Sequence, residues 1–136
     1  MKIKESKELT AYLLKKYDLS IYDVEVFMPN DQAIIDYKIT KNTIAYCDSS
    51  KYKMRLSVVY MLALSKKRVY DIVIHEIAHA LDHRKNGSHN VGSHGFTWQL
   101  LAAKLGVEPK PLLKLTPFET FKVDFYRFIY GLRIFF

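Results

Sequence analysis

The segment from Arg68 to Lys85 constrains the fold of this 136-residue chain more than any other stretch. One apolar stripe runs along it at the i, i+4, i+7, i+11 spacing of a helix: Tyr70, Ile74, Ile77 and Leu81. A helix with one apolar stripe buries that stripe against other elements. The pattern therefore predicts a long helix whose apolar side faces the core.

All five histidines lie in this helix or shortly after it, between His75 and His94. His75 to His79 reads HEIAH, an HExxH pattern, and residues four apart share a helix face, so both imidazoles can reach one Zn²⁺ at about 2.0–2.1 Å. Glu76 points about 100° around the helix, where a carboxylate can take a proton from the attacking water. The alternative is a buried helix with two neutral histidines at its edge.

A catalytic zinc needs a third protein ligand and one open position. The pattern HExxHxxGxxH would require a histidine at position 85, which is Lys85. A downstream glutamate would have to be Glu108 or Glu119, and neither stands in a recognisable motif. These residues therefore offer no clear third ligand.

Three further histidines remain for this role. His83 lies on the same helix, and a row of three histidines spaced by four residues spans about 12 Å, too far to converge on one ion. His89 falls in the glycine-rich loop. His94 stands where the loop ends and the next helix begins, so it can fold back over the first helix. We expect His94 to be the third ligand.

The remaining chain predicts short helices and strands. Residues 33–39 and 42–47 are β-branched and aromatic and are separated by Thr-Lys-Asn, which favours an antiparallel pair. Gly106 is a natural stop for a helix. The expected elements are helices at 7–17, 68–85 and 96–105 and strands at 24–28, 33–39, 42–47 and 54–59. The expected fold is α+β, with a small, mostly antiparallel sheet of three to four strands, an N-terminal helix and the HExxH helix.

The C-terminal segment, residues 110–136, is aromatic and basic, and we expect it to dock on the domain or on a partner. Thr116 followed by Pro117 and Glu119 is a capping-box start. The phenylalanines that follow recur at helical spacing, although Phe121, Val123 and Phe125 also alternate as in a strand. We favour the helix.

Length and composition suit one domain, residues 1–136. The single Cys47 excludes an internal disulfide and a four-cysteine zinc site, and it is most simply a buried or half-buried strand residue. Neither a secretory signal nor an apolar run of about 18 residues is found, so we expect a cytoplasmic protein without a membrane partner. The net charge of +7 favours DNA or another polyanion, although it also serves solubility.

The motifs resemble those of the SprT-like, or Spartan-type, zinc metallopeptidase family. HEIAHAL, a loop and then HGFTW follow a strand containing MRLS, and the similarity covers Lys53–Leu105. The resemblance implies a zincin-like fold and one catalytic Zn²⁺ on His75, His79 and His94, with Glu76 as general base. It also implies a protein or peptide substrate, often DNA-associated. Many family members carry a C-terminal cysteine zinc ribbon, which this chain lacks.

The expected reaction is metal-assisted hydrolysis of a peptide bond. A peptide in such a site adds a strand to a sheet edge, for which 42–47 is the candidate. Tyr46 and Trp98 either line the cleft or belong to the core, and for an aromatic beside a helix the core is favoured. Asp82 and His83 either orient a ligand imidazole or lie at a solvated helix end.

Two other functions fit parts of the sequence. A small basic nucleic-acid-binding protein would use the histidines for a structural zinc, and removing that metal would unfold it. An interaction protein would use the aromatic C-terminal segment to contact a partner. Unfolding on chelation would distinguish the nucleic-acid-binding protein from a peptidase, and the oligomeric state would test the interaction protein.

Overall fold

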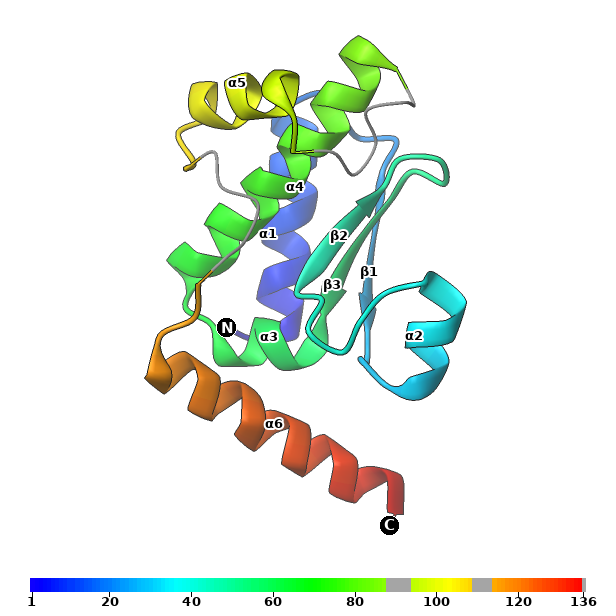
Figure 1. The fold of residues 1–136 in the computed structure, drawn as a ribbon, viewed down its shortest axis with the longest axis vertical. Coiled ribbons are helices and arrows are strands. Elements are labelled where there is room, and N and C mark those ends of the chain that lie inside the picture. Colours follow the sequence, from blue (N-terminus) through cyan, green and yellow to red (C-terminus); the bar gives the residue numbers. More distant parts are fainter. Residues whose placement is uncertain (88–93, 109–113, 136) are drawn as a thin grey trace.

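The computed structural model describes residues 1–87, 94–108 and 114–135. Its elements combine several helices with one small sheet, which confirms the expected α+β class (Figure 1). The helices are α1 (Ile3–Lys16), α2 (Asp31–Tyr37), α3 (Val58–Ala63), α4 (Lys66–Asn86), α5 (Phe96–Lys104) and α6 (Pro117–Phe135). The strands are β1 (Asp23–Phe27), β2 (Ala45–Asp48) and β3 (Lys53–Ser57).

The sheet is mixed, with the strand order β1-β3-β2. β1 runs parallel to β3, with Val24 opposite Met54, and β2 runs antiparallel to β3, with Tyr46 opposite Arg55. The sequence favoured mostly antiparallel pairing. A parallel pair needs a crossover connection, and here α2 and β2 lie within the connection between β1 and β3. The strand expected at 54–59 ends earlier, because α3 begins at Val58.

The strand predicted at 33–39 is wrong, because these residues belong mostly to α2. The side chain of Asn30 caps this helix by accepting a hydrogen bond from the Ala33 N–H at 2.9 Å. Gln32 donates to Asp36 at 2.7 Å, one turn further on. The predicted antiparallel pairing of 33–39 with 42–47 is therefore also wrong, and the actual partner of β2 is β3.

α1 and α4 lie side by side and pack against the sheet (Figure 1). The predicted stripe of α4 faces this core: Ile74 and Ile77 are fully buried, and Tyr70 and Leu81 pack partly buried against it. The core also contains fully buried side chains from α1 and β3, namely Leu13, Leu14, Met54 and Leu56. The N-terminal helix is thus confirmed, although it begins at residue 3 rather than 7.

Local signals set the ends of α4 and α5. The Ser65 hydroxyl accepts a hydrogen bond from the Arg68 N–H at 3.4 Å and caps α4, which extends two residues beyond the expected start. The loop predicted after α4 lies partly at 88–93, outside the described residues. Gly106 follows α5 with a φ of 86°, a backbone conformation that favours glycine, as its expected role as a helix stop requires.

α6 confirms the helical interpretation of the C-terminal segment. Glu119 N–H donates to the Thr116 hydroxyl at 3.1 Å, and the Glu119 carboxylate accepts from the Thr116 N–H at 2.9 Å, so the capping box forms. Val123 is buried in the core, and α6 packs against α3. The side chains at 132–136, which include the apolar end, lie outside the described residues.

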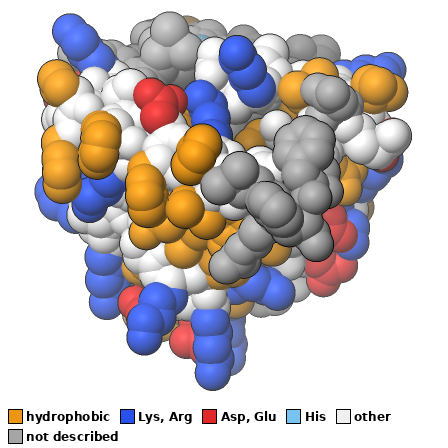
Figure 2. All heavy atoms as spheres, turned by 90° about the horizontal axis from the view of Figure 1, so that it is seen from below, with side chains coloured by type: hydrophobic (Ala, Val, Ile, Leu, Met, Phe, Trp, Pro, Cys, Tyr) orange, Lys and Arg blue, Asp and Glu red, His pale blue; other side chains and the backbone are white. Residues whose placement is uncertain are grey.

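Another side of α6 carries phenylalanines that are at least half exposed: Phe118, Phe121, Phe125 and Phe128. Figure 2 looks at the molecule from the side on which α6 lies and shows hydrophobic side chains on this face, with Lys and Arg side chains around them.

Among the described residues, none of the helices has both the length and the apolar character needed to cross a bilayer.

Candidate metal centre

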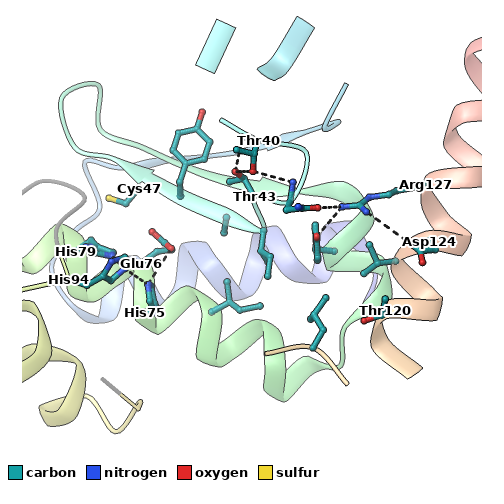
Figure 3. Close-up of a pocket in the computed structure, with 18 residues that line it drawn as sticks. Thr40, Thr43, Cys47, His75, Glu76, His79, His94, Thr120, Asp124 and Arg127 are labelled. Carbon is teal, nitrogen blue, oxygen red and sulfur yellow. Dashed lines mark hydrogen bonds and ion pairs between the residues drawn. The ribbon is translucent and has the colours of Figure 1, made fainter. Parts of the chain in front are cut away.

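Two helices bring three histidine side chains to one point. His75 and His79 lie one turn apart on α4, with ring centroids 5.2 Å apart. His94 stands just before α5, and its Nε2 atom lies 3.2 Å from His75 Nε2 and 3.1 Å from His79 Nε2 (Figure 3). The potential ligand atoms of the three residues all lie within 4.8 Å of one another. The structure thus brings together the three histidines that the sequence singled out.

The donor set suits a metal ion. Nitrogens of a tetrahedral site with bonds of about 2.0–2.1 Å stand about 3.3 Å apart, close to the two separations measured to His94. Burial, together with the neighbouring imidazoles, lowers the pKa of His75 to about 4 and that of His79 to about 3. Neutral imidazoles have the free lone pair that metal binding requires. These residues could therefore hold a metal ion, and imidazole donors suit zinc and several other transition metals.

Glu76 lies beside the histidines. Its side chain is largely buried, and its Oε1 atom is 3.9 Å from His75 Nε2. Burial raises the pKa of this carboxyl to about 8, while a backbone hydrogen bond from Cys47 lowers it. A cation held by the histidines would favour the charged carboxylate. The structure thus places a buried carboxyl group beside the three imidazoles.

Trp98 packs against the rings of the three histidines. It is fully buried, stacks on His79 at 5.1 Å between centroids, and donates a hydrogen bond from its indole N–H to the His75 carbonyl at 3.4 Å. Of the two roles that the sequence left open, Trp98 therefore takes the core role. Sequence reasoning missed this contact with the histidines, although the spacing of four between His94 and Trp98 is a signal for it.

A hollow of about 720 Å³ opens next to the histidines and Glu76 (Figure 3). Residues 42–47 line one side of it, with Tyr46 among them. β2 is an edge strand of the sheet, so a further strand can pair with it. The expected cleft and the candidate sheet edge thus lie at the same place as the histidine cluster.

The other candidate residues lie apart from the cluster. Asp82 is buried and accepts a hydrogen bond from Asn86 at 2.7 Å. Within the described residues, His79 Nδ1 and His83 Nδ1 have no hydrogen-bond partner, so neither Asp82 nor His83 orients the His79 imidazole there. Glu119 pairs with Arg68 instead, at 2.8 Å. Glu108 is not among the residues grouped with the histidines, and His89 lies outside the described part.

Cys47 is near the site without being a nucleophile. Its Sγ lies 3.4 Å from the Ser49 hydroxyl, and burial raises the pKa of the thiol to about 12. A thiol with such a pKa remains protonated at neutral pH and is a poor nucleophile. The sequence predicted a buried or half-buried strand residue, and Cys47 lies half-buried in β2.

An α+β fold that positions three converging imidazoles beside a buried carboxyl defines a protein with a candidate metal centre of the HExxH type. In a comparison with protein families, the model of the SprT-like family matches residues 14–119. The chain belongs to the SprT-like family. Searches of curated proteins and of solved structures found no match.

Proposed function

We propose that this protein is a zinc-dependent metallopeptidase that hydrolyses peptide bonds in protein or peptide substrates. The observation that carries the proposal is the convergence of His75, His79 and His94 with Glu76 buried beside them at one end of a hollow. Membership of the SprT-like family supports it. In this proposal the three histidines are the ligands of one catalytic Zn²⁺, and Glu76 is the general base.

Each residue has a physical task in this reaction. A bound Zn²⁺ supplies a Lewis acid that acidifies water and polarises the substrate carbonyl. Glu76 accepts a proton from the attacking water at its carboxylate and then delivers this proton to the leaving amine. Its burial keeps bulk water away from the proton that it carries. The free edge of β2 orients the peptide by backbone hydrogen bonds.

The finer proposal that the substrates are associated with DNA rests on charge. The chain carries 21 Lys and Arg against 14 Asp and Glu, a net charge of +7, which attracts polyanions at long range. This charge is also the observation that favours the second candidate, a nucleic-acid-binding protein with a structural zinc. The two candidates differ in the role of Glu76: the peptidase needs its carboxylate for hydrolysis, whereas the nucleic-acid-binding protein does not need it for binding.

The experiment that tests the proposal compares the wild type with Glu76→Gln, both loaded with zinc, on an unfolded polypeptide such as reduced casein. We expect the variant to lose at least about 10²–10⁴-fold in hydrolysis, because an amide cannot accept the proton. Zinc content and the thermal unfolding midpoint should stay within error of the wild type, since no proposed ligand changes. Full activity in Glu76→Gln, or an inactive wild type with bound zinc, would reject the proposal.

A further inference from the structure

The hollow beside the histidines continues well past them. Figure 3 shows the histidines and Glu76 at one end and α6 at the other, with β2 and α4 between them. The wall at the far end consists of side chains from α6: Thr120, Val123, Asp124 and Arg127. These four positions lie beyond residue 119, where the match to the SprT-like family model ends. The far wall is therefore a feature of this chain outside the matched region.

This wall is held in place at two points. Near its start, Glu119 accepts hydrogen bonds from Arg68 at 2.8 and 3.0 Å, and Arg68 also donates to the Lys114 carbonyl at 2.7 Å. These bonds tie α6 to the first turn of α4.

Further along α6, Arg127 forms the second attachment. It donates to the Lys41 carbonyl at 2.9 Å and to the Tyr60 hydroxyl at 3.0 Å. It also donates to the Asn42 side chain at 3.2 Å. The bonds to residues 41 and 42 connect α6 with the segment that leads into β2, so the two sides of the hollow are fixed relative to each other.

Apolar side chains line the hollow from three sides. Ile44 and Ala45 come from the β2 side, Ile72 from α4, and Leu115 and Val123 from the α6 side. The charged groups that line the α6 end are Asp124 and Arg127, which lie 3.8 Å apart and offset each other. An apolar side chain can lose its water against these side chains without leaving a charge unpaired.

We propose that α6 forms the end of a specificity pocket for one large apolar substrate side chain, of the size of Leu, Ile, Met or Phe, in the part of the hollow away from the histidines. This inference rests on the proposed function, because it places a peptide substrate in the hollow. The same hollow contains the histidine cluster, these apolar side chains and residues at the edge of β2, which identifies the occupant as part of that peptide. α6 would thus select substrates without taking part in the chemistry.

Thr120→Trp is the variant that tests this pocket. Thr120 lines the hollow but is exposed, so a tryptophan can enter the hollow without disturbing the buried core. The matched control is Phe121→Trp, which adds the same ring at the next position of α6. Phe121 is 66% exposed and does not line the hollow.

The measurement is binding of fluorescein-labelled decapeptides of Gly, Ser and Ala, with one Leu or one Gly at a scanned position, to zinc-loaded Glu76→Gln protein. We expect one Leu position to tighten binding on the order of tenfold. Adding Thr120→Trp should reduce this preference to about twofold or less, whereas adding Phe121→Trp should keep it. No preference for Leu at any position, or a preference that Thr120→Trp leaves intact, would overturn the pocket.

The activity of the wild type separates this result from the proposed function. If the wild type cuts no polypeptide while the Leu preference and its loss in Thr120→Trp are both found, the peptidase proposal fails and the pocket stands. If the wild type cuts and no Leu preference exists, the pocket fails and the peptidase proposal stands.

Discussion

At the scale of single residues, the candidate metal centre depends on the spacing of its histidines in the sequence and on the packing of Trp98 against their rings. HExxH sets His75 and His79 side by side, and the position of His94 before α5 brings the third imidazole to them. Trp98 fills the space behind these rings and contacts all three, at centroid separations of 4.7, 5.1 and 4.7 Å. The orientation of the histidines therefore depends on this one large side chain.

Trp98→Ala tests this dependence. Removing a fully buried tryptophan leaves a cavity, so we expect the free energy of unfolding to fall by about 3–5 kcal/mol. Phe96→Ala is the control on the same helix, because Phe96 is 73% exposed and should change the free energy by no more than about 0.5 kcal/mol. Urea unfolding followed by circular dichroism measures both. An equal loss of unfolding free energy in the two variants would show that packing of Trp98 does not stabilise this part of the fold.

The local pattern was enough to predict which three histidines come together, since HExxH and the HGFTW motif that begins at His94 are short-range signals. Glu76 was assigned from its place beside His75. The role of Trp98 and the position of α6 at the end of the hollow were not predicted, because both depend on how distant segments meet. Residues 68 and 119, for example, lie 51 positions apart in the sequence and form an ion pair.

At the scale of elements, local signals predicted most helices but missed α2, α3 and the parallel pairing of β1 with β3. The strand expected at 54–59 covered the start of α3. α4, α5 and α6 carry caps and stops that are visible in the sequence. α2 was missed because its isoleucines favour strands, whereas the Asn30 cap and the Gln32–Asp36 hydrogen bond favour a helix. The parallel pairing of β1 with β3 joins segments about 30 residues apart, which no local pattern specifies.

The attachment of α6 leads to a pH-dependent prediction. Hydrogen bonds from Arg68 hold the pKa of Glu119 below its ordinary value of 4.5. The stabilisation is therefore fully present above about pH 4.5 and is lost as the pH falls through the folded-state pKa. Glu119→Gln keeps a side chain that can complete the capping box but removes the charge. We expect it to lower the free energy of unfolding by roughly 1–3 kcal/mol at pH 7.

Urea unfolding of wild type and Glu119→Gln between pH 7 and pH 3 checks this prediction. The difference in the free energy of unfolding between wild type and Glu119→Gln should shrink as the pH drops below about 4.5. The control is Asp71→Asn, which breaks the exposed Lys67–Asp71 pair one turn into α4 and should cost at most about 0.5 kcal/mol. A difference for Glu119→Gln that stays constant with pH would refute the role assigned to its charge.

At the scale of the whole molecule, the main core and the histidine cluster are distinct. The large core joins α1, the sheet, α3 and α4, whereas Trp98, Ala78 and Ala102 form a smaller cluster under the histidines. The fold therefore has apolar burial that does not depend on a metal. We expect protein stripped of zinc by a chelator to keep its helical circular dichroism, whereas the structural-zinc alternative expects it to unfold.

We propose that His75, His79 and His94 together hold one metal ion, and zinc titration of the metal-free, folded protein tests this directly. Zinc binding is measured calorimetrically for the wild type, His94→Ala and His83→Ala. We expect one zinc per chain in the wild type, no more than a tenfold loss of affinity in His83→Ala, and more than about a hundredfold loss in His94→Ala. Unchanged zinc affinity in His94→Ala, or a larger loss in His83→Ala, would show that these three histidines are not the zinc ligands.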